Sequence, residues 1–308
     1  MYSRGSSLSS RPSVLELISP DASCLEHIHH SPYVVRRRSL QPHLGETHHV
    51  SRGTLNVLVE QVSHHPSVAA IHVTDANGIE IIGCHPMAPK YHGASVDIMV
   101  RGQRQMRLLN KGEKYVMEHP NMVVRFLPIP GVHWLGNITI SCQETGLEAE
   151  LCYGEDYFYR KNSHHRSVTG TIFQSSSRRA IYNISGNWDR AVTVKDLSNG
   201  KLTVIYDAKD CLSGLKTPIL KEPEMLLPSE SVVVWAEVSK CIMSKSWDQA
   251  KEAKTVVEER ERELARQRKA RGETWVPKHF TVSQSKESGW DCFPKQKWVP
   301  TAPIIVPA

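Results

Sequence analysis

The stretch Glu60-Gln61-Val62-Ser63-His64-His65-Pro66 decides the fold and marks a candidate site. It continues directly from Leu55-Asn56-Val57-Leu58-Val59, whose alternating apolar pattern predicts a half-buried strand. Side chains on a strand alternate between its two faces, so His64 and His65 would point in opposite directions if the strand continued. Pro66 favours a break in the strand at this point, which would let both rings turn towards one ligand.

Composition places the chain among ordinary globular proteins. Of its 308 residues, 40% are hydrophobic and 23% are charged, which suits one large domain or two small ones. No apolar run approaches the roughly 18 residues that a membrane-spanning helix needs. Residues 1–12 contain no hydrophobic segment of the secretory type, so we expect no signal peptide there.

The seven cysteines are far apart and include no C-x-x-C pair. Their odd number and scattered spacing argue against a disulfide framework and against a zinc ribbon. A reducing cytosol fits this pattern best, so we expect a cytoplasmic protein.

A net charge of +6 and a pI near 8.9 favour an anionic partner. Nucleic acid is not expected, because the chain carries no recognisable nucleic-acid-binding motif and its basic residues are spread along the sequence. An anionic membrane surface or a phosphorylated lipid suits this charge equally well.

The region from 41 to about 240 is typical of antiparallel sheet. Three pairs of short apolar segments each flank a turn that contains glycine, at residues 75–78, 143–146 and 197–200. Short strands at regular spacing with almost no helical periodicity indicate a large sandwich or barrel. A long meander tends to close on itself, and a wide barrel leaves an interior cavity.

The segments on either side of this region differ from it. Residues 1–40 show no sustained periodicity, and we expect them to be disordered or atypical. Ser246–Gly272 predicts one long helix, with Ser246 as N-cap and Gly272 at the C-terminal end. A thin apolar stripe predicts that one side of this helix packs: Trp247, Ala250, Ala253, Val257 and Leu264. We expect the tail to 308 to wrap over the body of the protein.

Lys254, Glu258 and Arg262 are spaced four residues apart on this helix and therefore share one face. The plainer interpretation is a solvated ladder of ion pairs, each worth a few tenths of a kcal/mol. The functional alternative is that Lys254 and Arg262 bind phosphate oxygens while Glu258 orients them.

The sequence gives little support for a catalytic site or a metal site. Four His-His pairs occur, but none has the helical i, i+4 spacing of a zinc enzyme, and no G-x-S-x-G elbow is present. We therefore predict no metal, no cofactor and no catalytic residue. The pairs are His29-His30, His48-His49, His64-His65 and His164-His165.

Three motifs in order resemble the oxysterol-binding protein family. Glu60 to Pro66 is similar to its E-Q-V-S-H-H-P-P signature, and Leu44-Gly45-Glu46-Thr47 to its N-P-x-L-G-E-T segment. Lys254 to Arg262, followed by Gly272, Trp275, Pro277 and Phe280, resembles its carboxy-terminal K-x-x-x-E-E-x-Q-R … G-x-x-W-x-P-x-x-F pattern. The resemblance covers roughly residues 41–280.

The resemblance implies a mainly β fold: a large antiparallel, nearly closed β-barrel around a hydrophobic tunnel, with a C-terminal α-helical subdomain. We expect 41–240 to form the barrel and 241–308 to form a helix and wrapping tail of the same domain. It also implies that phosphatidylinositol 4-phosphate binds through its head group to His64, His65, Lys254, Glu258 and Arg262. The matching signature residues are expected to support this site: Leu44, Gly45, Glu46, Glu60, Ser63 and Pro66.

The chain departs from the family pattern at several positions. Ser67 replaces the second proline of the signature, Gln41 replaces an asparagine, and Glu261 stands where glutamine is common. Residues 1–40 do not resemble the lid that covers the tunnel in this family. We therefore expect a shortened form with an open tunnel mouth and weaker retention of sterol.

The resulting hypothesis is a non-enzymatic lipid-transfer protein that exchanges phosphatidylinositol 4-phosphate and a sterol between membranes. Its expected partners are membrane lipids and anionic membrane surfaces. We expect a monomer, peripheral at membranes from the cytoplasmic side and active at endoplasmic reticulum contact sites. The alternatives are a carrier of another lipid such as phosphatidylserine, and a lipid-dependent sensor or scaffold with little net transport.

Overall fold

A computed structural model describes residues 42–128, 130–154, 166–213, 216–221, 224, 226–285, 289–300 and 302–307. The expected disorder of 1–40 lies outside these residues, as do Cys24 and two of the His-His pairs, His29-His30 and His164-His165.

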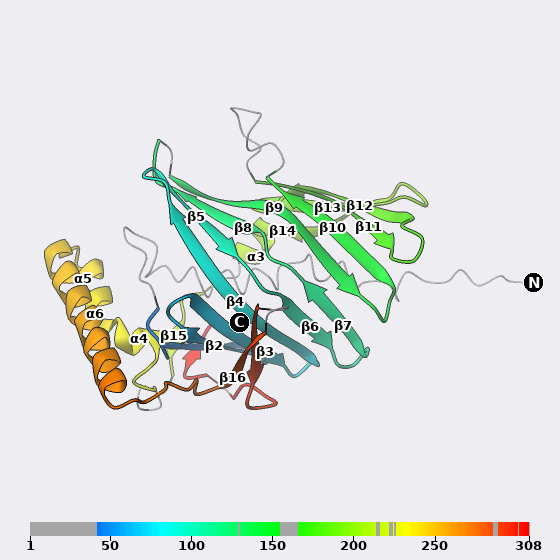
Figure 1. The fold of residues 1–308 in the computed structure, drawn as a ribbon. Coiled ribbons are helices and arrows are strands. Elements are labelled where there is room, and N and C mark those ends of the chain that lie inside the picture. The colour runs from blue at the N-terminus through cyan, green and yellow to red at the C-terminus, as the bar shows by residue number, and fades with distance from the viewer. Residues whose placement is uncertain are drawn as a thin grey trace, which may run out of the picture.

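A single large sheet dominates the described part of the chain and curves strongly around itself (Figure 1). Its strands pair in the order β14-β13-β12-β11-β10-β9-β7-β6-β4-β3-β2-β1-β18-β15, with β5 and β8 joined beside β4 and β9. All pairings are antiparallel except that of β1 with β18. The mainly β, antiparallel fold predicted from the sequence is confirmed. The strands are β1 (Thr47–Arg52), β2 (Leu55–Ser63), β3 (Ser67–Asp75), β4 (Ile79–Tyr91), β5 (Ser95–Val100), β6 (Arg104–Leu108), β7 (Glu113–Met117), β8 (Asn121–Arg125), β9 (Gly131–Cys142), β10 (Leu147–Tyr153), β11 (Ser167–Gln174), β12 (Ala180–Asn187), β13 (Ala191–Asp196), β14 (Leu202–Asp207), β15 (Ile219–Leu220) and β18 (Ile304–Ile305).

The three expected turns all connect neighbouring strands. In the first, the amide of Gly78 donates to the carbonyl of Asp75, and Asp75 also accepts from the backbone and side chain of Asn77. Gly78 has φ +84°, a left-handed conformation that glycine adopts at little cost. Local turn chemistry thus sets the register of the β3–β4 hairpin.

The central strands are buried on both faces. One face of the sheet carries a large apolar cluster that includes Val57, Ile71, Tyr115 and Ile172. The opposite face of β2, β3 and β4 carries a second, smaller cluster, which the C-terminal tail covers. Its members are Val62, Val68, Ala70, Cys84, Phe280 and Cys292.

The tail wraps over the body, and it does so with regular structure that the sequence did not predict. A two-stranded hairpin, β16 (Phe280–Ser285) and β17 (Gly289–Pro294), lies against β4 and β2 (Figure 1). Beyond it, β18 adds to the large sheet beside β1. Phe280 and Val282 alternate with exposed Thr281 and Ser283, and Trp290 and Cys292 flank Asp291, but each alternation is too short to identify a strand from the sequence.

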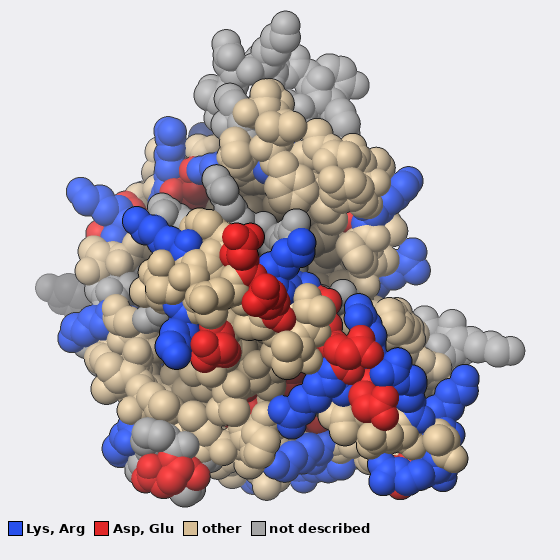
Figure 2. Space-filling model, turned by 90° about the vertical axis from the view of Figure 1, so that its left-hand side faces the viewer, with Lys and Arg blue, Asp and Glu red and all other residues tan. Residues whose placement is uncertain are grey.

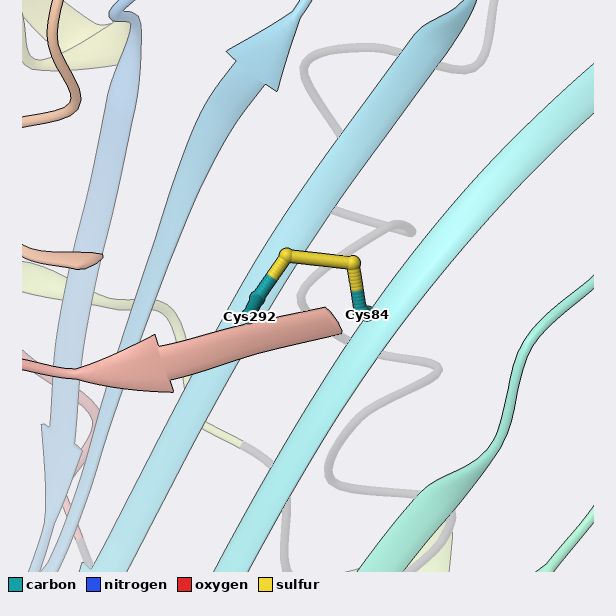
Figure 3. The surroundings of a disulfide bond; sticks show 2 residues. All are labelled: Cys84 and Cys292. Atoms are coloured by element: carbon teal, nitrogen blue, oxygen red, sulfur yellow. A yellow bond between two sulfur atoms is a disulfide. The ribbon is translucent and has the colours of Figure 1, made fainter. Parts of the chain in front are cut away.

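A disulfide joins this hairpin to the sheet, between Cys84 on β4 and Cys292 on β17 (Figure 3). Their Cα atoms are 5.4 Å apart, which lies within the usual range for a disulfide. The sequence argued against a disulfide framework, and that expectation is corrected for this pair. Spacing alone could not reveal it, because 208 residues separate the two cysteines.

Helices gather at one end of the sheet, on the left in Figure 1. They are α4 (Ser231–Val234), α5 (Ala236–Met243) and α6 (Trp247–Ala270), while α3 (Ala208–Ser213) follows β14. The helical region therefore begins before residue 240. Ser246 occupies the N-cap position of α6 but its side chain makes no capping bond, and Gly272 follows the C-cap with φ +66°. Trp247 does not pack as expected, since 46% of it is exposed.

Within the described residues, no helix is long and apolar enough to cross a bilayer.

Candidate functional site

A short loop before β1 lies beside the end of β2 and belongs to the candidate site. In it, the amide of Gly45 donates to the carbonyl of Gln61, and the amide of Gln61 donates back to the carbonyl of Glu46. Gly45 has φ +82°, and a Cβ there would lie 3.1 Å from the Trp275 ring. The Leu44-Gly45-Glu46 segment therefore needs glycine to bring this loop beside the end of β2.

Glu46 fixes the loop to the helices. Its carboxylate accepts hydrogen bonds from the His43 amide at 2.9 Å, the Ser231 hydroxyl at 2.6 Å and the Trp235 indole at 3.0 Å. Burial nevertheless raises the pKa of this carboxyl, and the charge of Glu261 adds to the effect. Glu46 is thus a positioning residue for His43 and for the start of α5.

Three histidine rings lie close together: His64 and His65 follow β2, and His43 comes from the loop before β1. The rings of His64 and His65 lie 4.5 Å apart edge to face, and His43 lies 6.5 Å from His64. His43 in turn stacks on Trp235 at 5.0 Å. Because β2 ends at Ser63, His64 and His65 stand in a turn and not on opposite faces of a strand.

On α6, Lys254, Glu258 and Arg262 form the expected line of charges. Glu258 pairs closely with Lys254, and its other oxygen lies 3.7 Å from Arg262. The hydrogen bond from Lys254 lowers the pKa of Glu258, and the Lys254 and Arg262 charges lower it further. Lys254 and Glu258 are partly buried, whereas 60% of the Arg262 side chain is exposed and it also pairs with Glu259 at 3.1 Å.

His43 connects the histidines with the helix. Its pKa is lowered first by burial and then by His64, while the Glu258 charge raises it and the Lys254 charge lowers it. The charges of Lys254 and Glu258 on α6 therefore act on the pKa of a ring in the histidine cluster. Of the site residues predicted from the sequence, His64, Lys254 and Glu258 are thus the ones whose charges act on His43.

Two ring nitrogens in the cluster are buried without a hydrogen-bond partner in the described part of the chain: His43 Nε2 and His64 Nδ1. Burial also lowers the pKa of His64, an effect that His65 strengthens and a hydrogen bond to the Pro42 carbonyl opposes. Unpaired buried nitrogens are costly, so they mark a place where a polar ligand would be stabilised.

The other signature residues act around the site. The Glu60 carboxylate accepts from the amides of Lys278 at 2.6 Å and His279 at 2.8 Å, so it anchors the segment that follows α6. The Gln61 side chain donates to the Ser63 carbonyl and to the Ser67 hydroxyl. Ser67, which replaces the second proline of the family signature, therefore accepts a hydrogen bond from the signature strand. Pro66 is exposed and ends the turn.

Sequence reasoning missed His43 and Trp235. His43 stands directly before the Leu44-Gly45-Glu46-Thr47 motif, and that proximity was the one signal that could have identified it. Trp235 carried no signal, because its role depends on a stacking contact between distant parts of the chain. No group of three or more histidine, cysteine or acidic side chains suited to a metal occurs among the described residues.

Comparison with known proteins agrees with these motifs. A sequence model for the oxysterol-binding protein family matches residues 25–240, a range that begins before the motifs quoted above and ends before α6. Oxysterol-binding protein-related protein 4A of Arabidopsis thaliana is 48% identical over 278 residues, covering 89% of this chain and 72% of the relative. Protein 4C of the same plant is 47% identical and covers 90% of this chain and 73% of its own length.

Solved structures support the fold. The Osh1 ORD domain in complex with ergosterol matches with a TM-score of 0.69 at 19% identity, over 89% of this chain and 72% of that one. The Osh3 ORD of Saccharomyces cerevisiae, in complex with PI(4)P, matches with a TM-score of 0.63 at 16% identity, over 88% and 74%. The chain therefore belongs to the oxysterol-binding protein family and has its lipid-binding, lipid-transfer domain.

Proposed function

We propose that this protein binds phosphatidylinositol 4-phosphate and a sterol in turn and exchanges them between membranes without breaking a covalent bond. The observation that carries the proposal is the proximity of the His43, His64 and His65 rings to one another, together with the effect of the Lys254 and Glu258 charges on His43. The protein would act peripherally, at membranes that face the cytoplasm.

The head group would be held by charge. A phosphoinositide head group carries several negative charges, and burying them without compensation would be very costly. Lys254 and Arg262 supply fixed positive charge, and the unpaired nitrogens of His43 and His64 can supply hydrogen bonds. Glu258 would keep the two cations in place until a phosphate competes for them.

The apolar part of each lipid would occupy the interior of the curved sheet. We infer that the larger of the two apolar clusters, which runs from Val57 on β2 to Val194 on β13, lies on that interior face. Burial of an acyl chain contributes about 0.8 kcal/mol per CH₂ group, so this surface can compete with a bilayer for the lipid. That the Osh1 domain is in complex with ergosterol and the Osh3 domain with PI(4)P supports a fold able to take both classes.

Extraction from liposomes tests the head-group site. We expect His64→Ala/His65→Ala to abolish extraction of phosphatidylinositol 4-phosphate, and Lys254→Ala to weaken it by roughly tenfold or more, the loss of one charge-assisted contact. Lys269→Ala is the matched control, because it removes a lysine from the exposed last turn of the same helix. Undiminished extraction by the double variant would overturn the assignment.

The second lipid is tested separately. Native mass spectrometry of the purified protein should show a co-purified sterol, and a liposome-to-liposome assay should show that phosphatidylinositol 4-phosphate accelerates sterol transfer. Co-purified phosphatidylserine would point to the other carrier function. Tight binding with negligible transfer would favour a sensor or scaffold.

A further inference from the structure

The β4–β5 hairpin and the turn after β8 together form an exposed apolar projection, here called the sheet tip. Three of its side chains are largely exposed: Tyr91 at 70%, Leu127 at 65% and Phe126 at 46%. The amides of Phe126 and Leu127 both donate to the carbonyl of Ala94, at 2.8 and 3.4 Å, and hold the two turns together. Exposure of three large apolar side chains at one place indicates an interaction surface.

Strand register places the sheet tip at the same end of the sheet as the histidine cluster. Ser67, the first residue of β3, pairs with Met87 on β4, and the turn with His64 and His65 directly precedes Ser67. β4 continues for four residues past this pair, to Tyr91. At about 3.3 Å per residue, the tip extends about 13 Å beyond the histidine turn.

Positive charge lies just below the apolar side chains. Lys90 precedes Tyr91, and Arg125 precedes Phe126 and pairs in register with Ser95. The acid on the facing strand is Asp97, which stands opposite Lys90 and lies 3.1 Å from His92. Lys90 and Arg125 together outnumber this acid, so the tip carries a net positive charge beneath its apolar end, an arrangement that suits the interface of an anionic membrane.

A second apolar projection lies on the same side of the molecule, at the corner between α5 and α6. Met243 is 66% exposed and Trp247 is 46% exposed there. In Figure 1 this corner and the sheet tip both lie on the left-hand side, with the sheet tip above the upper end of α6. Viewed from that side, positive and negative side chains alternate over the lower right, whereas the upper middle of the surface is uncharged, with Lys and Arg side chains to its left and right (Figure 2).

We propose that the sheet tip inserts Tyr91, Phe126 and Leu127 into the surface of an anionic bilayer and thereby turns the head-group site towards the lipid that it extracts. The proposal rests on the proposed function, because it identifies the membrane-facing end by the head-group site. A folded protein partner fits less well, since a specific interface takes roughly 20 residues from each side.

Vesicle binding tests the docking surface. Tyr91→Ser/Phe126→Ser/Leu127→Ser should bind phosphatidylcholine vesicles that contain phosphatidylserine roughly tenfold or more weaker than the unaltered protein, because three apolar side chains no longer insert. The matched control is Leu202→Ser/Val204→Ser, which removes apolar side chains that are 66% and 59% exposed on the edge strand β14. It should bind as the unaltered protein does. Equal binding by the triple variant, or an equal loss in the control, would overturn the proposal.

Two further measurements separate docking from the head-group site. Lys90→Gln/Arg125→Gln should weaken binding to anionic vesicles and leave binding to pure phosphatidylcholine vesicles unchanged. The water-soluble probe glycerophosphoinositol 4-phosphate should bind the triple variant as tightly as the unaltered protein. If the triple variant alone failed to bind the probe, Tyr91, Phe126 and Leu127 would be needed for the head-group site or for folding. That result would overturn the docking proposal. If no protein binds the probe, the proposed function fails, and vesicle binding still decides the docking surface.

Discussion

At the scale of single residues, we expect the histidine cluster to make binding of the proposed phosphate ligand depend on pH. Burial is the main cause that lowers the pKa of His43 and that of His64 below the ordinary 6.5. A phosphate beside them raises both pKa values, and binding then takes up protons. The added affinity is complete below the pKa of the free rings and is lost as pH rises through the pKa of the bound rings.

We therefore expect the affinity for a soluble short-chain phosphatidylinositol 4-phosphate to rise as pH falls from about 8 towards about 6. Titration calorimetry at constant ionic strength measures it. The ligand phosphate titrates near pH 6 as well, so His43→Asn, which removes one of the two rings with a lowered pKa, serves as the reference and should show a flatter dependence. The same slope in both proteins would contradict a role for this ring.

The residues of the site differ in how well the sequence could predict them. His64, His65 and the charges on α6 stand in ordered motifs, and a line of charges four residues apart follows directly from helix geometry. His43 could not be assigned, because its role arises from stacking on Trp235 and from its distance to charges on another element. A contact between distant parts of the chain leaves no local pattern.

At the scale of elements, Glu60 joins the signature strand to the segment after α6. It is fully buried, and its two accepted bonds come from the backbone amides of Lys278 and His279. We expect Glu60→Ala to lower the free energy of unfolding by about 1–3 kcal/mol, the cost of leaving buried amides unsatisfied. Glu60→Gln should lose less, since its carbonyl still accepts one bond.

Urea unfolding measures this loss, and hydrogen exchange at the amides of 278 and 279 locates it. Glu150→Ala is the control, because Glu150 is an exposed acid on β10 whose partner is the surface residue Arg178. Unchanged protection of both amides in Glu60→Ala would contradict the anchoring role.

Elements with strong local signals were predicted best. The β3–β4, β9–β10 and β13–β14 hairpins and the long helix follow from turn residues and from periodicity. The β16–β17 hairpin and α5 did not, because each is short and takes its stability from the surface that it covers. Trp247 was predicted to pack and is exposed, since its position at the first turn of α6 extends beyond the covering surface.

At the scale of the whole molecule, the C-terminal tail packs on the sheet, and we expect the two to behave as one unit. The tail contributes Phe280 and Cys292 to a buried cluster, and β18 extends the sheet beside β1. We expect urea unfolding followed by tryptophan fluorescence, which includes Trp275, Trp290 and Trp298 of the tail, to coincide with that followed by circular dichroism of the sheet. Separate transitions would divide the chain into two domains.

The disulfide adds a long-range constraint to this unit. A bond that closes a loop of about 200 residues restricts the unfolded chain strongly, and native disulfides typically contribute about 2–4 kcal/mol. The oxidised protein should therefore unfold at a higher urea concentration than its reduced form or Cys84→Ala/Cys292→Ala. Peptide mapping without reductant should recover the two cysteines in one linked fragment. Cys211→Ala, at a cysteine of α3 outside the disulfide, should keep the full response to reductant. If reduction left the urea midpoint unchanged, packing of the hairpin alone would hold the tail on the sheet, because both cysteines lie within the same apolar cluster.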